Sequence, residues 1–143
     1  MREPTASSSL VSLFPLESMS IRYTDLIVWQ KAIMLVTTVY EVTRQFPNNE
    51  RYALALQLRK ASISIASNIA EGYGRSTRRD TASFLVRARG SVFEVETQLI
   101  IANNLKYLAT DEFEKLLASV REIGRMLTGL LKYLTRESIG TRH

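Results

Sequence analysis

The chain has 143 residues and a net charge of +5, from 19 Lys and Arg against 14 Asp and Glu. It has no cysteine and its one histidine is the last residue, which excludes disulfides, thiolate chemistry and an ordered histidine triad or metal site. No apolar run approaches the roughly 20 residues of a membrane helix, so we expect a soluble, cytoplasmic, non-enzymatic protein with no cofactor, metal or membrane partner.

The N-terminal segment, residues 1–22, is rich in serine and contains two prolines. Its apolar run at 10–14 is too short for a good signal peptide. We predict a disordered tail here, because the segment lacks a helical period of apolar residues. Met19 opens a stretch that reads like a natural start, so Met1 and Met19 both stay open as the first residue.

Apolar residues at three- and four-residue steps predict two helices in the first half of the chain. The first is expected from about residue 24 or 25 to 46, with one buried stripe of Leu26, Trp29, Ile33, Val36 and Tyr40. Pro47 stops it, and Asn48 or Asn49 can cap the second helix, which reaches about Glu71. Its inward residues are Leu54, Leu58, Ala61, Ile65 and Ile69. Gly72-Tyr73-Gly74 then supplies a glycine where a helix usually ends in a left-handed residue.

Two further helices are predicted in the second half. Ser76 or Thr77 caps the third, which extends to about Leu105 with a buried stripe of Leu85, Ala88, Val92, Val95, Leu99 and Ala102. The fourth begins with Thr110 as its cap and buries Phe113, Leu116, Val120, Ile123, Leu127, Leu130 and Leu134. Because no strand pattern competes and the connections are short, we predict an all-α, antiparallel up-down-up-down four-helix bundle over residues 23–136, followed by a flexible tail over 137–143.

The third helix carries a second apolar stripe beside its core stripe: Val86, Gly90, Phe93, Thr97 and Ile100. Gly90 costs about 1 kcal/mol of helix stability relative to Ala, which indicates close approach of another backbone. A half-apolar patch of about 400 Å² offers roughly 5 kcal/mol of gross burial, and patches of this size usually mark interfaces. We predict a homo-oligomer interface here; a broad core face is the alternative.

Positive charge is concentrated between residues 51 and 90, where eight Lys or Arg stand against two acidic residues. Focused positive charge attracts phosphates. We predict that RNA or DNA backbone is contacted by Arg59, Lys60, Arg75, Arg78, Arg79 and Arg87. The alternative is a protein–protein interaction scaffold that binds a partner protein without nucleic acid, with the charge serving solubility or steering.

Residues 64–75 and 87–99, supported by 25–32 and 122–127, resemble a bacterial family of four-helix-bundle proteins encoded in intervening sequences of 23S ribosomal RNA genes. The family is related to accessory proteins of diversity-generating retroelements. The resemblance implies a homopentamer with no established enzymatic activity, and kinship with those accessory proteins, which are basic bundles that bind a reverse transcriptase and nucleic acid. The polar signature positions are Asn68, Glu71, Arg89, Ser91 and Glu94, interpreted as a structural network that holds the second and third helices together.

Overall fold

The computed structural model describes the backbone of residues 22–140 and the side chains of residues 22–136. The expected tail over 1–22 lies outside this part, apart from Arg22. The described chain is helical and contains no strand, which confirms the all-α prediction. Its elements in chain order are η1 (Tyr23–Asp25), α2 (Ile27–Thr43), η2 (Asn48–Glu50), α3 (Leu54–Tyr73), α4 (Arg78–Asn104) and α5 (Thr110–Gly140).

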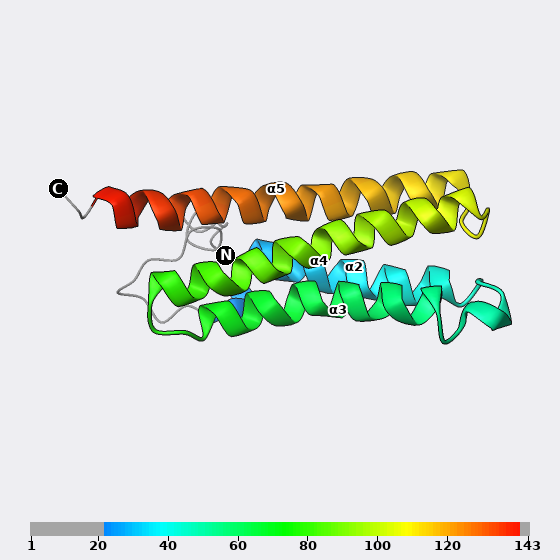
Figure 1. Ribbon diagram of the computed structural model, residues 1–143, viewed down its shortest axis with the longest axis horizontal. Coiled ribbons are helices and arrows are strands. Elements are labelled where there is room, and N and C mark those ends of the chain that lie inside the picture. The colour runs from blue at the N-terminus through cyan, green and yellow to red at the C-terminus, as the bar shows by residue number, and fades with distance from the viewer. Residues whose placement is uncertain (1–21, 141–143) are drawn as a thin grey trace, which may run out of the picture.

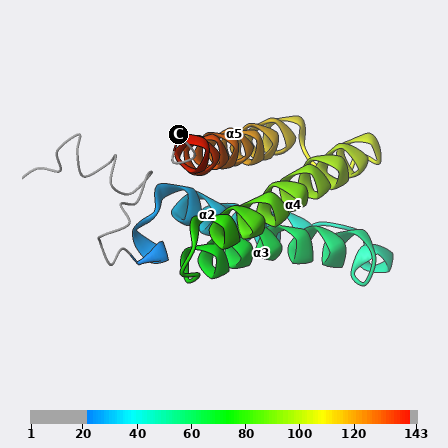
Figure 2. The same ribbon diagram turned by 60° about the vertical axis from the view of Figure 1, so that its left-hand side comes forward.

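Successive helices run antiparallel, up and down the long axis of the molecule (Figure 1). The closest packing joins α3 to α4 and α4 to α5, while α2 lies against α3 and α5. The helices α2 and α4 are therefore placed across the diagonal of the bundle. Figures 1 and 2 both show α4 and α5 meeting near their connecting loop and diverging toward the N-terminus of α4 and the C-terminus of α5.

The buried face of α2 differs from the predicted one. Ile33 and Tyr40 are exposed, so the predicted stripe is wrong at these two positions. The core side chains of α2 are instead Val28, Ala32, Leu35, Val39 and Val42. Lys31 is the only charged residue between 27 and 40, so apolar residues satisfy a helical period on two neighbouring faces. Packing against α3 and α5 selects one of them.

The start of α3 also differs from the prediction. Pro47–Glu50 close a 3₁₀ turn, in which the Glu50 N–H donates to the Pro47 carbonyl oxygen. The first helical residue of α3 is consequently Leu54, with no side-chain cap on it, and the predicted cap by Asn48 or Asn49 is wrong. The predicted inward positions are confirmed as buried or, at Leu54, partly buried.

Neither Gly72 nor Gly74 adopts the predicted left-handed conformation, because no glycine in the described chain has a positive φ. A Cβ at Gly72 would lie 3.0 Å from the Phe84 Cβ and 3.2 Å from the Thr81 carbonyl oxygen. The Thr81 hydroxyl donates to the Gly72 carbonyl oxygen at 2.8 Å. The glycine therefore allows close contact between α3 and α4.

The second half of the bundle follows the predicted pattern closely. Thr77 caps α4 by accepting the Asp80 N–H at 3.1 Å, and all six predicted core positions of α4 are buried. In α5 the predicted stripe is buried from Leu116 to Leu134, with Phe113 partly covered. The backbone of α5 continues as a helix through Gly140, four residues beyond the expected end of the bundle at 136.

Candidate functional site

Three exposed arginines lie in the connection between α3 and α4 and in the first three turns of α4. The guanidinium carbons of Arg75 and Arg87 lie 4.5 and 4.8 Å from the centroid of the Phe84 ring. Cation–π contacts of this kind restrict a flexible side chain without neutralising its charge. Arg79 is exposed in the first turn of α4. We call Arg75, Arg79 and Arg87 the end cluster.

Arg59 and Arg78, also predicted to contact nucleic acid, are built into the bundle. The Arg59 guanidinium stacks on Tyr40 at 4.7 Å, and its Nε donates to the buried Thr43 Oγ1 at 2.8 Å. Arg78 is half-buried and lies 5.4 Å from the Tyr133 ring centroid. These two arginines tie α3 to α2 and α4 to α5.

The six predicted contact residues do not share one surface. Arg59 and the exposed Lys60 lie near the start of α3, whereas the end cluster begins just after its last turn. At 1.5 Å per residue, Arg59 and Arg75 are about 24 Å apart along the helix axis. Arg59 and Arg75 are close in the sequence, but the length of α3 separates them, so they lie toward opposite ends of the bundle.

A small cavity at the connection between α2 and α3 collects three arginines. Its volume is about 160 Å³, and Arg44, Arg51 and Arg59 contribute to its lining. Arg44 and Arg51 are not among the contact residues predicted from the sequence. The sequence could have indicated that they lie together, because they stand on either side of the Pro47 turn and a tight turn brings its two flanks together.

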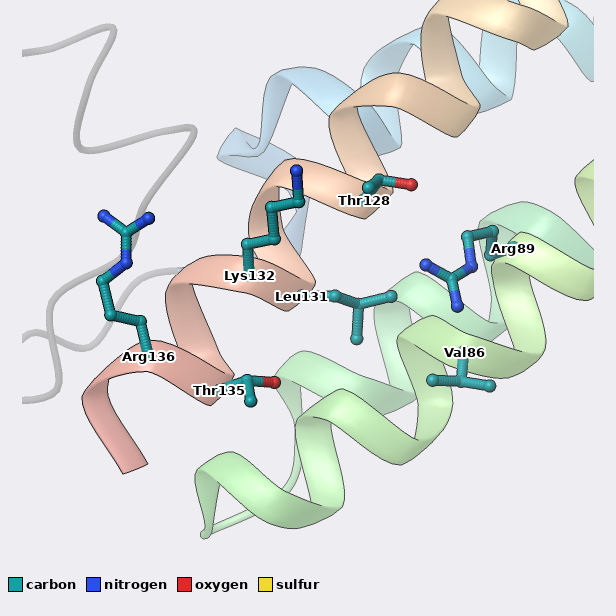
Figure 3. A pocket seen from close by; sticks show the side chains of 7 residues that line it. All are labelled: Val86, Arg89, Thr128, Leu131, Lys132, Thr135 and Arg136. Atoms are coloured by element: carbon teal, nitrogen blue, oxygen red, sulfur yellow. The ribbon is translucent and has the colours of Figure 1, made fainter. Parts of the chain in front are cut away.

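A longer groove runs between the diverging parts of α4 and α5. Two hollows of about 550 and 510 Å³ share Arg89, Thr128 and Lys132 and so form one feature. In Figure 3, Val86 and Leu131 lie between the two helices, and the Arg89 guanidinium extends toward α5. We call this the α4–α5 groove; its apolar lining is Val86, Val92, Phe93 and Leu131, and its cations are Arg89, Arg121, Arg125, Lys132 and Arg136.

The cations that α5 contributes to this groove were missed from sequence. They follow each other at steps of four, seven and four residues, which places them on one helix face. Arg121 forms an ion pair with Glu96 at 3.3 Å. In the described part of the chain, no carboxylate pairs with Arg89, Arg125 or Lys132, so their charge is available to a ligand.

The predicted polar network between the second and third helices is smaller in the structure. Ser91 Oγ donates to Ser64 Oγ at 2.8 Å, and Asn68 Nδ2 donates to the Ser64 carbonyl oxygen at 2.9 Å. Glu71 and Glu94 are exposed, and Arg89 lines the α4–α5 groove. The prediction is wrong for these three, because the rotation of each helix directs their side chains away from the α3–α4 contact.

The predicted oligomer stripe is open on this chain. Val86, Phe93 and Ile100 are 50%, 59% and 40% exposed, and Gly90 and Thr97 are exposed as well. A Cβ at Gly90 would meet nothing within 4 Å, so packing within the chain does not require a glycine there. Self-association through this stripe stays a prediction.

No catalytic or metal-binding arrangement stands out in the described residues. Burial and the nearby Tyr133 raise the pKa of Tyr73, and the hydrogen bond from the Tyr107 hydroxyl to Glu50 raises the pKa of Tyr107. Both shifts lead away from neutral pH, where an acid–base catalyst needs its pKa. No three Asp, Glu, His or Cys side chains gather as metal ligands across residues 22–136, and the described helices include none with the length and hydropathy of a membrane span.

Comparison with known proteins gives a family and a fold. The family model described as 23S rRNA-intervening sequence protein matches residues 24–129. A solved structure of a protein of unknown function, from the S23 ribosomal protein family of Bacteroides thetaiotaomicron, superposes with a TM-score of 0.70 at 20% sequence identity. The match covers 74% of this chain and 99% of that one. No curated protein matches this chain.

Proposed function

The chain belongs to the family of 23S rRNA-intervening sequence proteins, and on this premise we propose that it is a non-enzymatic, self-associating protein that binds the phosphate backbone of RNA or DNA in the cytoplasm. The observation that carries the proposal is the end cluster. The Arg75 and Arg87 guanidiniums both contact the Phe84 ring, and no carboxylate of the described chain pairs with them. Contacts to phosphate position a nucleic acid without reading its bases.

The arrangement of the other cations supports an extended ligand. The arginine cavity lies at the opposite end of α3 from the end cluster, and the α4–α5 groove adds further cations. A polyanion bridges such separated clusters, whereas a small anion occupies only one. Self-association, into a homopentamer as the family resemblance implies, would repeat each cluster and strengthen weak contacts through avidity.

The test is a fluorescence anisotropy titration of the full chain with a labelled RNA oligonucleotide and its DNA equivalent at several NaCl concentrations. We expect the association constant to fall steeply with salt, because each neutralised phosphate of a single strand contributes a logarithmic slope of about −0.7. Arg79→Glu should lower affinity at low salt, since it reverses an exposed charge in the end cluster.

Lys115→Glu is the matched control. It makes the same change of net charge at an exposed position near the start of α5, away from the end cluster. Binding that does not vary with salt, or equal effects of Arg79→Glu and Lys115→Glu, would contradict backbone binding at this cluster.

The alternative function, an interaction scaffold for a partner protein, is favoured by the exposed apolar residues Met34 and Phe93. Surfaces of this kind mark protein interfaces more often than nucleic-acid sites. Under this alternative the titration shows no binding to either oligonucleotide even at low salt. A partner recovered by the wild type from nuclease-treated lysate, and lost with an exposed apolar residue replaced, would then support the scaffold.

A further inference from the structure

The arginine cavity, at the connection between α2 and α3, is lined by three guanidiniums and by no carboxylate. Arg44, Arg51 and Arg59 contribute to its wall, and no Asp or Glu does. Among the described residues, none forms an ion pair with any of these arginines. Like charges brought together around a small space repel each other. The arrangement therefore favours an anion that the chain itself does not supply.

The carboxylate nearest in sequence is engaged elsewhere. Glu50 directly precedes Arg51, but it does not line the cavity. Its Oε2 instead accepts the Tyr107 hydroxyl at 2.8 Å, in the connection between α4 and α5. Since this hydrogen bond holds Glu50 against a different element, the charge of Arg51 is left to a ligand.

The guanidinium of Arg59 is fixed in place by its neighbours on α2. Its Nε donates to Thr43 Oγ1 at 2.8 Å, and it stacks on the Tyr40 ring. Thr43 is 3% exposed, and its hydroxyl donates to the Val39 carbonyl oxygen at 2.7 Å. The two terminal nitrogens of Arg59 have no acceptor among the described residues. A guanidinium held by its Nε loses little further freedom when those nitrogens donate to an oxyanion.

The start of α3 brings backbone donors to the same cavity. Ala55, the second residue of α3, lies in the cavity wall and is 2% exposed. The Gln57 N–H donates to the Ala53 carbonyl oxygen, and no side chain caps the helix. Within the described chain, the N–H groups of residues 54–56 consequently have no acceptor. Unpaired N–H groups at a helix start favour anions, and a buried one costs free energy when it stays unpaired.

The size and shape of the cavity select the kind of anion. Its volume of about 160 Å³ is below the roughly 300 Å³ at which pockets for drug-sized ligands begin, so it suits one phosphate group. It is also more enclosed than the α4–α5 groove. An internal phosphate of a nucleic acid has chain on both sides and needs an open groove, whereas a phosphomonoester has a single substituent. A phosphomonoester also carries a charge of about −1.5 to −2 and three free oxygens, which matches several guanidiniums.

We propose that the arginine cavity binds a phosphomonoester, with Arg44, Arg51 and Arg59 donating to its free oxygens and the first N–H groups of α3 facing the same charge. Two sources carry this group: the phosphorylated end of a nucleic-acid strand and a small phosphorylated molecule. The site goes beyond backbone binding by the end cluster and does not depend on it. The connection between α2 and α3 lies at the opposite end of the molecule from the connection between α3 and α4 (Figure 1).

The first test is isothermal titration calorimetry of the full chain with inorganic phosphate at low ionic strength. Arg51 is exposed, and Arg51→Gln should weaken phosphate binding by about tenfold or more, because a hydrogen bond to a charged group is lost. Arg51→Lys keeps the charge but not the planar fork, so it should weaken binding less than Arg51→Gln.

Arg22→Gln is the matched control. It makes the same change at an exposed arginine beyond the opposite end of α2, and it should leave the affinity for phosphate unchanged. Circular dichroism checks that each variant is folded.

The second test identifies the source of the phosphate. A labelled RNA with a 5′ phosphate and the same RNA with a 5′ hydroxyl are compared by fluorescence anisotropy. Tighter binding of the phosphorylated strand, by a margin that Arg51→Gln removes, assigns the site to a strand end. Equal behaviour of the two strands, together with phosphate binding in the calorimeter, assigns it to a small phosphorylated molecule.

Other outcomes overturn the site. A wild type that neither binds inorganic phosphate nor distinguishes the two strands has no phosphomonoester site. Unchanged phosphate binding in Arg51→Gln, or equal losses in Arg51→Gln and Arg22→Gln, would place the phosphate on other cations. Failure of the proposed function gives a different result: phosphate binding that depends on Arg51, with neither RNA bound, would remove nucleic acid as the ligand and keep the cavity.

Discussion

Gly72 shows that the role of a residue can depend on a neighbour far along the chain. Its place at the end of α3 resembles a helix-ending glycine, yet what requires the glycine is the approach of Phe84 and Thr81 from α4. Gly129 is the opposite case, because a Cβ there would meet nothing within 4 Å. A side chain at Gly72 would therefore meet α4, whereas a side chain at Gly129 would meet no neighbour.

We predict opposite effects of alanine at these two glycines. Alanine favours a helix over glycine by about 1 kcal/mol, so Gly129→Ala should stabilise the fold by up to about that amount. Gly72→Ala should destabilise it by about 1–3 kcal/mol, because the new methyl group displaces a backbone oxygen and a Cβ in a packed contact. Guanidinium unfolding in the Phe93→Glu background measures both without a contribution from association. Shifts of the same sign would contradict this account of Gly72.

The role of each arginine's charge also depends on neighbours that are distant in the sequence. Arg59 and Arg78 appear with Arg75 and Arg79 in one basic segment of the sequence, but the first two stack on aromatic rings of a neighbouring helix. Their charge helps to join helices, whereas that of Arg79 faces solvent. Residue type alone therefore does not indicate which cations a polyanion can reach.

At the scale of an element, α2 is the helix whose orientation the sequence left ambiguous. Apolar residues lie on two neighbouring faces, and a helical period fits both. The other helices alternate more clearly between apolar and polar positions, and their buried stripes were predicted correctly. The residues that pack against α3 and α5 decide the rotation of α2.

Adjacent substitutions in α2 test this rotation. Leu35 is buried in the core, so Leu35→Ala should cost about 2–5 kcal/mol of unfolding free energy through lost burial and the resulting cavity. Met34 is its exposed neighbour, and Met34→Ala should change the stability of the dissociated chain by no more than about 0.5 kcal/mol. Denaturant unfolding in the Phe93→Glu background compares them. A larger loss at Met34 than at Leu35 would contradict the rotation of α2 that buries Leu35.

At the scale of the whole molecule, association should be visible as a dependence of stability on protein concentration. A folded oligomer in equilibrium with unfolded chains gains roughly 1 kcal/mol per chain for each tenfold rise in concentration. We predict that the denaturation midpoint of the wild type rises with concentration, and that Phe93→Glu in the predicted oligomer stripe abolishes the rise. Urea unfolding of dilute and concentrated samples measures this. A concentration-independent midpoint in the wild type would contradict an obligate oligomer.

The sequence by itself indicated the family through motifs spread along the chain. It also determined the all-α class, a cap on α4 at Ser76 or Thr77 and the core stripes of α3, α4 and α5, because each of these depends on residues only a few positions apart. Hydrogen bonds along a helix and the spacing of its apolar side chains are local properties. Only the tertiary structure decided which face of α2 is buried, which arginines share a surface, and that α4 and α5 diverge to form a groove. These features depend on helices from distant parts of the chain, whose rotation and crossing are set by mutual packing.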